Sequence, residues 1–122
     1  MCFWGKTNPQ IDPAGWESGK GYNRAHLLAA MIGGSNKDRR NFVTMHSYAN
    51  SPVMRQVELQ VRNAVRNDEI IQYSVRAIYA DDNAKIPLGV IIEAHGNKGF
   101  QMYPHGSNSE GTNSFTIWNR KR

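Results

Sequence analysis

The sequence predicts one α+β domain in which a single main helix accompanies an antiparallel β-sheet. Residues 52–66 carry apolar side chains at intervals of three and four residues, the spacing of an amphipathic helix. Several short apolar segments on either side of it end at glycine or polar turns, as strands do. The chain has 122 residues, of which 39% are hydrophobic, so it has room for one compact core. We therefore expect residues 1–122 to form one domain.

The first half of the chain is predicted to be an irregular segment followed by two strands. Residues 1–20 are rich in proline and glycine and are expected to be irregular. Residues 22–32 are mostly apolar and end at paired glycines, which favours a short buried strand. A polar and basic loop over residues 35–40 leads to a second apolar segment at residues 41–45. The expected unit is therefore a strand, a loop and a strand, which the helix follows.

The main helix has clear predicted ends. Ser51 is a good N-cap residue and Pro52 suits the first helical position, and the polar residues after residue 66 favour a stop. Glu58 and Arg62 lie one turn apart on one face of this helix, next to its apolar side. Their spacing allows an ion pair at the border of the buried face.

The second half of the chain, residues 67–119, is predicted to form antiparallel strands. Residues 70–79 alternate well enough for a strand, and a polar turn at residues 81–83 follows them. Residues 88–94 and 115–119 are the remaining predicted strands. Because short polar segments separate these strands, we expect them to form an antiparallel sheet.

The composition favours a polyanionic partner. The formal net charge is +5 and the isoelectric point is about 9.6, which suits nucleic acid but also anionic lipid or an acidic protein. Cys2 is the single cysteine, which excludes an internal disulfide and a multi-cysteine metal site. The longest apolar run, residues 27–32, is far shorter than the roughly 18 residues of a membrane span. The first residues also lack the pattern of a secretory signal.

Residues with the chemistry of phosphodiester hydrolysis begin at residues 21–26, Gly-Tyr-Asn-Arg-Ala-His, and continue with Asn50, Glu58 and Arg62. Cutting a phosphodiester requires a general base for water and a cation against the charge that develops on the phosphate. Arginines that hold the phosphate complete the set. A histidine base, an oxygen ligand for a metal and phosphate-facing charge are all present in this group.

This pattern resembles the DNA/RNA non-specific endonuclease family of the ββα-metal (His-Me finger) superfamily. Residues 21–26 are similar to the Asp-Arg-Gly-His motif of that family. Residues 41–43, followed by Asn50, are similar to a segment that ends at a metal-binding asparagine at the start of a helix. The likeness covers about residues 21–66 and continues more loosely to about residue 100. It implies a ββα-metal core over residues 21–66 and a metal-dependent endonuclease.

The resemblance also implies a role for each matching residue. His26 would be the general base, and Asn50 the single protein ligand of Mg²⁺, for which Mn²⁺ or another divalent ion would substitute. Arg24 would contact the phosphate or the transition state. Glu58 would hold water on the metal, and Arg62 would clamp the scissile phosphate or fix Glu58. Because Mg²⁺ keeps most of its waters, one neutral asparagine ligand is sufficient.

Supporting positions follow from the same resemblance. Asn41 would support the site by hydrogen bonding. Asn23 stands where the family has aspartate, and it keeps the side-chain oxygen without the charge. Ala25 stands where the family has glycine, and Met45 where it often has glutamine. The general base and the metal ligand are unaffected by these departures.

Basic residues near the motif are predicted to grip a nucleic acid backbone. They lie on the loop after the His26 strand and along the helix: Lys37, Arg39, Arg40, Arg55 and Arg66. Contacts of this kind predict salt-sensitive binding that tolerates any base sequence. The sequence also resembles nuclease domains at the C-termini of bacterial polymorphic toxins. That likeness implies an acidic immunity protein as partner and secretion or delivery into a target cell as part of a larger protein.

Other interpretations stay open at the level of sequence. A nucleic-acid-binding module that has lost catalysis would also account for Asn23 and Ala25, and a basic protein-interaction domain would account for the charge. Taken alone, His26 is a core histidine and Asn50 a capping residue. The remaining histidines show no metal-ligand spacing, although His46 lies close to Asn50 in sequence. The tyrosines, Tyr73 among them, are expected in the core and at its rim.

Overall fold

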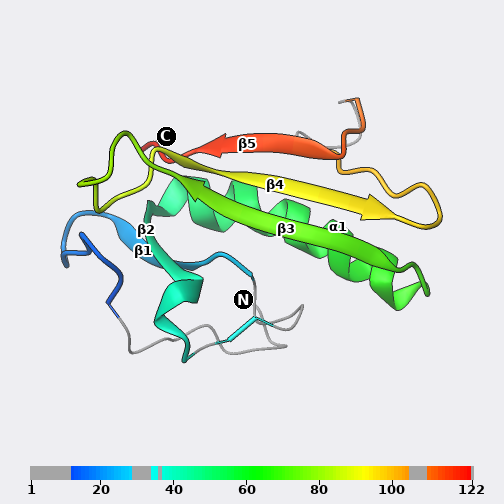
Figure 1. Cartoon of the computed structure of the whole chain (residues 1–122), viewed down its shortest axis with the longest axis horizontal. Coiled ribbons are helices and arrows are strands. Elements are labelled where there is room, and N and C mark those ends of the chain that lie inside the picture. The colour runs from blue at the N-terminus through cyan, green and yellow to red at the C-terminus, as the bar shows by residue number, and fades with distance from the viewer. Residues whose placement is uncertain (1–11, 29–33, 36, 105–109, 122) are drawn as a thin grey trace.

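A computed structural model gives the fold of the chain (Figure 1). It describes residues 12–28, 34–35, 37–104 and 110–121. The elements follow one another as β1 (Tyr22–His26), the 3₁₀ turn η2 (Arg39–Asn41), β2 (Phe42–His46), the π-helical segment η3 (Ala49–Met54), α1 (Arg55–Arg66), β3 (Ile71–Ile78), β4 (Gly89–Gly96) and β5 (Ser114–Trp118). One main helix and antiparallel strands confirm the predicted α+β class.

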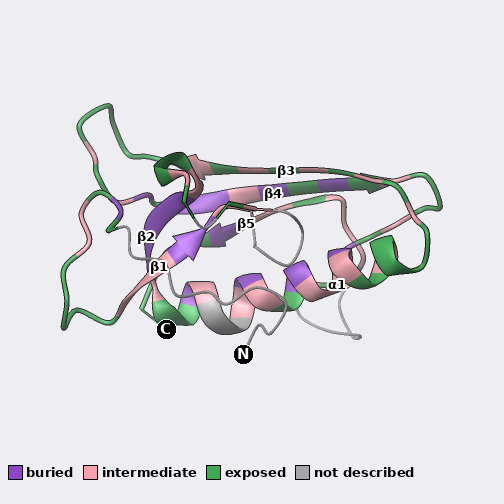
Figure 2. Ribbon diagram, turned by 90° about the horizontal axis from the view of Figure 1, so that it is seen from below, coloured by how far each residue is buried: buried purple, intermediate pink, exposed green. Residues whose placement is uncertain are grey.

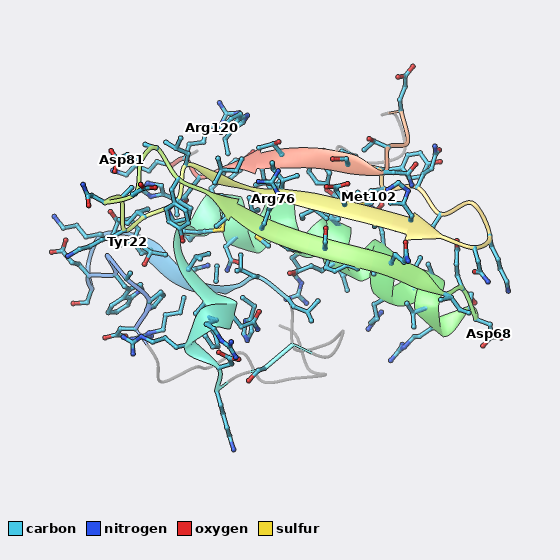
Figure 3. The ribbon with its side chains drawn as sticks, in the orientation of Figure 1. Tyr22, Asp68, Arg76, Asp81, Met102 and Arg120 are labelled. Atoms are coloured by element: carbon cyan, nitrogen blue, oxygen red, sulfur yellow. The ribbon has the colours of Figure 1, made fainter. Side chains whose placement is uncertain are left out.

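The strands form two antiparallel sheets rather than one. β1 and β2 make a two-stranded hairpin, and the other three strands form a sheet in the order β3-β4-β5. Figure 1 shows α1 running behind the three-stranded sheet, with the hairpin at the end of the molecule where the helix starts. In Figure 3, Tyr22 at the start of β1 and Asp68 just after α1 lie at opposite ends of the molecule.

The core lies between α1 and the inner face of the three-stranded sheet, as the buried positions in Figure 2 show. Along β4, Val90, Ile92 and Ala94 are buried at every second position, which points one face of the strand at the helix. Val57 and Val61 of α1 meet that face in the same buried cluster. The exposed side chains of β3 alternate with those that face the core and lie on the opposite face of the sheet: Gln72, Ser74 and Arg76. Figure 3 labels Arg76 on β3.

Helical structure begins earlier than the sequence predicts. The predicted N-cap Ser51 and first-turn Pro52 lie inside η3, and the chain is helical from Ser47. Ala49 and Met54 are almost fully buried, so core packing draws this turn into the helix. A proline inside a regular α-helix removes one backbone hydrogen bond, and the wider π-helical turn accommodates that interruption. The predicted start at residue 52 is therefore wrong, whereas the end at Arg66 is confirmed.

The first strand is shorter than predicted, because β1 ends at His26 and not at residue 32. Beyond it, Leu28 bonds to the Asn41 side chain instead of to a strand partner. Residues 29–32 of the predicted strand lie outside the described residues, as do residues 1–11 of the predicted irregular segment. The three later strands begin and end within two residues of their predicted limits. Within the part of the chain that is described, none of the helices is long and apolar enough to span a membrane.

Candidate active site

The hairpin places Arg24 and His26 on one of its faces. Residues pair across the two strands as His26 with Phe42 and Arg24 with Thr44, and the His26 and Phe42 ring centroids are 4.7 Å apart. His26 is only 7% exposed. Because side chains alternate along a strand, Ala25 and its neighbour Asn23 point to the opposite face. His26 is thus fixed at the end of β1 with its ring against an aromatic neighbour.

The core links the hairpin to the segment that carries Asn50. Ala25, next to His26, and Ala49, next to Asn50, are buried in the same cluster of apolar side chains. β2 also contacts η3 directly. The methyl group of Ala25, where the resembling family has glycine, is fully buried in this cluster. The predicted base and the predicted ligand therefore lie on neighbouring elements at the start of α1 (Figure 1).

Asn41 holds the chain that leaves β1. Its Oδ1 accepts a hydrogen bond from Leu28 N at 2.8 Å, and its Nδ2 donates to Leu28 O at 3.0 Å and Ser35 O at 2.9 Å. Its backbone oxygen accepts from Leu27 N at 2.8 Å. These bonds fix the backbone immediately after His26, which is where the sequence places a supporting residue.

Arg24 is engaged by a residue that the sequence did not single out. Its Nη2 lies 2.7 Å from Asp12 Oδ1, and its Nε donates to the same oxygen at 2.8 Å. The guanidinium carbon lies 4.0 Å from the centre of the Trp16 ring. Arg39 donates to the backbone oxygen of Asp12 at 3.4 Å. Asp12 thus joins two arginines that the sequence assigned to phosphate binding.

Asn50 lies in the π-helical segment η3 and is half-buried. Among the hydrogen bonds of the described residues, none uses its side-chain amide. A helix that widens at this point also departs from the regular backbone bonding of α1. The amide oxygen of Asn50 is therefore available to a ligand from outside the chain.

Glu58 is buried inside the fold. It is 8% exposed, and burial raises the pKa of its carboxyl to about 8, against a smaller opposite effect of the nearby Arg55 guanidinium. Side chains of an α-helix lean toward its N-terminus. The carboxyl of Glu58 therefore extends toward Arg55 and the segment that carries Asn50.

The predicted ion pair between Glu58 and Arg62 is absent from the ion pairs of the described residues. Arg62 donates through Nη2 to Asn63 Oδ1 at 3.0 Å, and the positive charge that acts on the Glu58 carboxyl is Arg55. Sequence reasoning gave Tyr73 of β3 no role in the site. Tyr73 packs on the core cluster and has a buried hydroxyl. Its alternation with exposed neighbours along β3 is the sequence pattern that indicates a side chain facing α1.

The predicted basic residues fall into separate groups. Lys37, Arg39 and Arg40 are exposed on the segment before β2, but Asp38 bonds Arg40 at 2.8 Å. Hydrogen bonds from Arg40 lower the pKa of the Asp38 carboxyl. Arg66 is exposed in the last turn of α1, about 16 Å along the helix axis from Arg55. The structure therefore brings Arg39, but not Arg66, to the hairpin end of the molecule.

Comparison with known families decides the relationship. The model of the family described as DNA/RNA non-specific endonuclease matches residues 5–97. The chain belongs to the DNA/RNA non-specific endonuclease family. The matched range contains His26, Asn50 and Glu58, so the motif that resembled this family lies within the matching sequence. No curated protein matches the chain.

Solved structures of nucleases share the fold. NucA from Streptococcus agalactiae matches with a TM-score of 0.74 and 19% identity without metal, over 93% of this chain. The same protein with a magnesium ion bound matches with a TM-score of 0.76 and 20% identity, over 96% of this chain. Sda1 nuclease with a bound zinc ion gives 0.65 and 19%, over 82% of this chain and 39% of its own. The chain spans 58% of the NucA chain.

The site residues of this family member suit a hard divalent cation. No three acidic, histidine or cysteine side chains gather into a ligand cluster among the described residues, so a dense protein cage does not form there. Asn50 offers a neutral amide oxygen that has no hydrogen-bond partner among the described residues, and Glu58 lies buried on the adjoining helix. Oxygen donors in such small number fit Mg²⁺, which retains several of its own waters.

Proposed function

We propose that this chain is an endonuclease that hydrolyses phosphodiester bonds of DNA, with RNA as a second substrate, largely without regard to base sequence. Membership of the endonuclease family supports the activity. The observation that carries the proposal is the Asn50 amide, which makes no hydrogen bond among the described residues and lies on the segment beside the hairpin that fixes His26. A half-buried polar group without a protein partner is suited to a ligand.

The proposed reaction is hydrolysis by in-line attack. His26 accepts a proton from water while the water oxygen bonds to phosphorus. The bond from phosphorus to the 3′ oxygen breaks and that oxygen takes up a proton from solvent water, so that the products carry a 5′ phosphate and a 3′ hydroxyl. Arg24 and Arg62 hold the phosphate oxygens, and Asn41 and Asn23 keep the hairpin in place around His26. Ionised Glu58 orients water by accepting hydrogen bonds.

The proposed cofactor is Mg²⁺, with Mn²⁺ or another divalent ion as a substitute. Asn50 would hold the ion through its amide oxygen. The bound ion would supply positive charge against the charge that develops on the phosphate and the leaving oxygen. That NucA has been solved with magnesium and Sda1 with zinc supports a divalent ion for the fold.

The proposed substrate contact is to the backbone. Lys37, Arg39 and Arg55 lie on the segments that flank His26 and Glu58, and Arg40 and Arg66 extend the basic surface. The net charge of +5 supports attraction to a polyanion. Such contacts confer affinity without reading bases.

We also propose that the chain serves as the toxin domain of an antibacterial effector. This rests on the likeness of the Asn-Arg-Ala-His segment to polymorphic toxin nucleases. An acidic immunity protein would then cover the basic surface, and the domain would reach its target as part of a larger secreted or delivered protein. To test this role, the domain is expressed in bacterial cells with and without the gene that neighbours its own gene. Toxicity that the neighbouring gene relieves supports the role, and expression without toxicity contradicts it.

Digestion of plasmid DNA and total RNA tests the activity. Purified wild type is compared with and without Mg²⁺, next to His26→Ala and the matched variant His95→Ala on the exposed side of β4. Because a positioned base contributes about 10² to 10⁴ in rate, His26→Ala should lose at least about 99% of cutting and keep its DNA affinity in EDTA. His95→Ala should behave as wild type.

The outcomes separate the alternatives. An equal loss of binding and cutting in His26→Ala contradicts its role as base. DNA binding without cutting under any divalent ion indicates a binding module that has lost catalysis. The absence of both binding and cutting indicates a protein-interaction domain.

Asn50→Ala tests the metal ligand. Loss of the only protein oxygen proposed for the ion should raise the Mg²⁺ concentration for half-maximal cutting by about tenfold or more. Asn83→Ala, in the exposed turn between β3 and β4, is the control and should leave the titration unchanged. An Asn50→Ala enzyme with a wild-type Mg²⁺ titration refutes the assignment.

A further inference from the structure

Tyr73 carries an anomaly that the fold does not explain. Its hydroxyl is buried and makes no hydrogen bond with the described part of the chain. A buried polar group without a partner is costly, and natural structures contain few of them. Phenylalanine would fill the same place in the core without that cost. We therefore expect the hydroxyl to have a hydrogen-bond partner beyond the contacts that the structure describes.

Glu58 is the ionisable group of α1 whose charge acts on the Tyr73 hydroxyl. Tyr73 lies on the face of β3 that packs against the core, and α1 contacts β3. Glu58 is 8% exposed on α1. Burial, followed by the charge of Glu58, raises the pKa of the Tyr73 hydroxyl. Both side chains thus lie in the interface between helix and sheet.

The chemistry of the two groups is complementary. A tyrosine hydroxyl below its pKa is a donor, and an ionised carboxylate is an acceptor with room for several donors. Within the described part of the chain, the Glu58 carboxylate takes part in no hydrogen bond, and Arg55 is the positive charge that acts on it. A donor from the sheet side would hold one carboxylate oxygen and leave the other toward the site.

We propose that Tyr73 is a positioning residue that donates a hydrogen bond to the ionised Glu58 carboxylate, directly or across one water. The bond orients Glu58 toward the segment that carries Asn50. Groups that orient a site residue in this way typically contribute about 10- to 100-fold to activity or metal affinity. The catalytic part of this proposal rests on the proposed function, whereas the hydrogen bond itself does not.

The first test is a double-mutant cycle on stability in EDTA, which needs no nuclease activity. Tyr73→Phe, Glu58→Met and the double variant are unfolded in urea near pH 9 and near pH 6, on either side of the Glu58 pKa of about 8. Methionine keeps the length of the side chain without a strong acceptor. A hydrogen bond to a charged group predicts that Tyr73→Phe raises the unfolding constant about tenfold near pH 9, and less near pH 6. Glu58→Met should remove this effect.

The second test is kinetic. With Mg²⁺, Tyr73→Phe should lower kcat about tenfold and leave KM near the wild-type value. In the Glu58→Met background the same change should have no further effect. Tyr79→Phe, exposed just after β3, is the matched control and should behave as wild type.

Each outcome of the two tests either supports or contradicts the positioning role of Tyr73. Equal effects of Tyr73→Phe with and without Glu58, in stability and in kcat, overturn the positioning role. A pH-dependent coupling in stability without any nuclease activity supports the hydrogen bond and refutes the proposed function instead. If Tyr73→Phe does not fold, Glu58→Met alone still provides a test. The change that it causes in the free energy of unfolding at the two pH values shows whether ionised Glu58 has a hydrogen-bond donor.

Discussion

Glu58 makes the stability of the chain depend on pH in a direction opposite to that of most carboxylates. Its pKa is about 8 in the folded chain and 4.5 as the ordinary value, so folding favours the protonated form. Below about pH 4.5 both states are protonated and Glu58 has no effect. As pH rises toward 8, the unfolded chain releases the proton while the folded chain keeps it, and the free energy of unfolding falls. Above about pH 8 both states are ionised and the loss is constant.

The magnitude follows from the two pKa values. A tenfold change in a protonation equilibrium is worth about 1.4 kcal/mol, so the difference between 4.5 and about 8 corresponds to at most about 5 kcal/mol. That is a large part of the roughly 5–15 kcal/mol that stabilises a typical domain. Glu58→Gln removes the titration, and the variant should therefore be progressively more stable than wild type as pH rises from 5 to 8.

Urea unfolding of wild type and Glu58→Gln in EDTA, at several pH values, measures this difference. Histidines and other carboxylates titrate in both proteins and cancel in the comparison. Glu93→Gln, on an exposed carboxylate of β4, serves as the control and should follow wild type. A difference between wild type and Glu58→Gln that stays constant from pH 5 to pH 8 would refute the reasoning. Addition of Mg²⁺ should reduce the pH dependence, because a nearby cation favours the ionised carboxylate.

The basic surface yields two further predictions. Asp12→Ala should tighten DNA binding severalfold at low salt in EDTA, because it removes a negative charge and frees the guanidinium group of Arg24. Unchanged or weaker binding in fluorescence anisotropy contradicts this. Arg39→Ala should reduce the slope of log affinity against log salt by about one. Arg40→Ala should reduce it less, because Asp38 already offsets that charge, and equal slopes for the two variants would show that the ion pair opens on DNA.

The elements that local sequence pattern controls were predictable. The helix is long and strongly periodic, and the strands alternate, so their existence and order follow from the sequence. The start of the helix was not predictable, because Ser51 and Pro52 are good first-turn residues by themselves. The burial of Ala49 and Met54 overrides them, and that burial depends on residues distant in sequence.

The site was predictable to the extent that it lies along one motif. The environment of Glu58 could have been inferred, since Val57 and Val61 enclose it on the buried arc of the helix. The Asp12–Arg24 pair could not, because it joins a strand to an irregular segment without periodicity. Tyr73 reaches the site only through the packing of β3 on α1, which no local pattern specifies.

Two departures from regular structure, buried Glu58 and the π-helical segment η3, lie on one continuous helical segment, and they support the proposed site without reference to the motif. A chain selected for stability alone would carry an apolar residue in place of buried Glu58, since an isolated carboxyl in the core disfavours folding. It would also continue α1 as a regular helix through η3, because π-helical turns are rare and concentrate at functional sites. Local rules are broken in natural proteins mostly where function requires it. Both exceptions lie on the helix that adjoins the His26 hairpin, so the stability sacrificed there has its counterpart in a site for ligand and substrate.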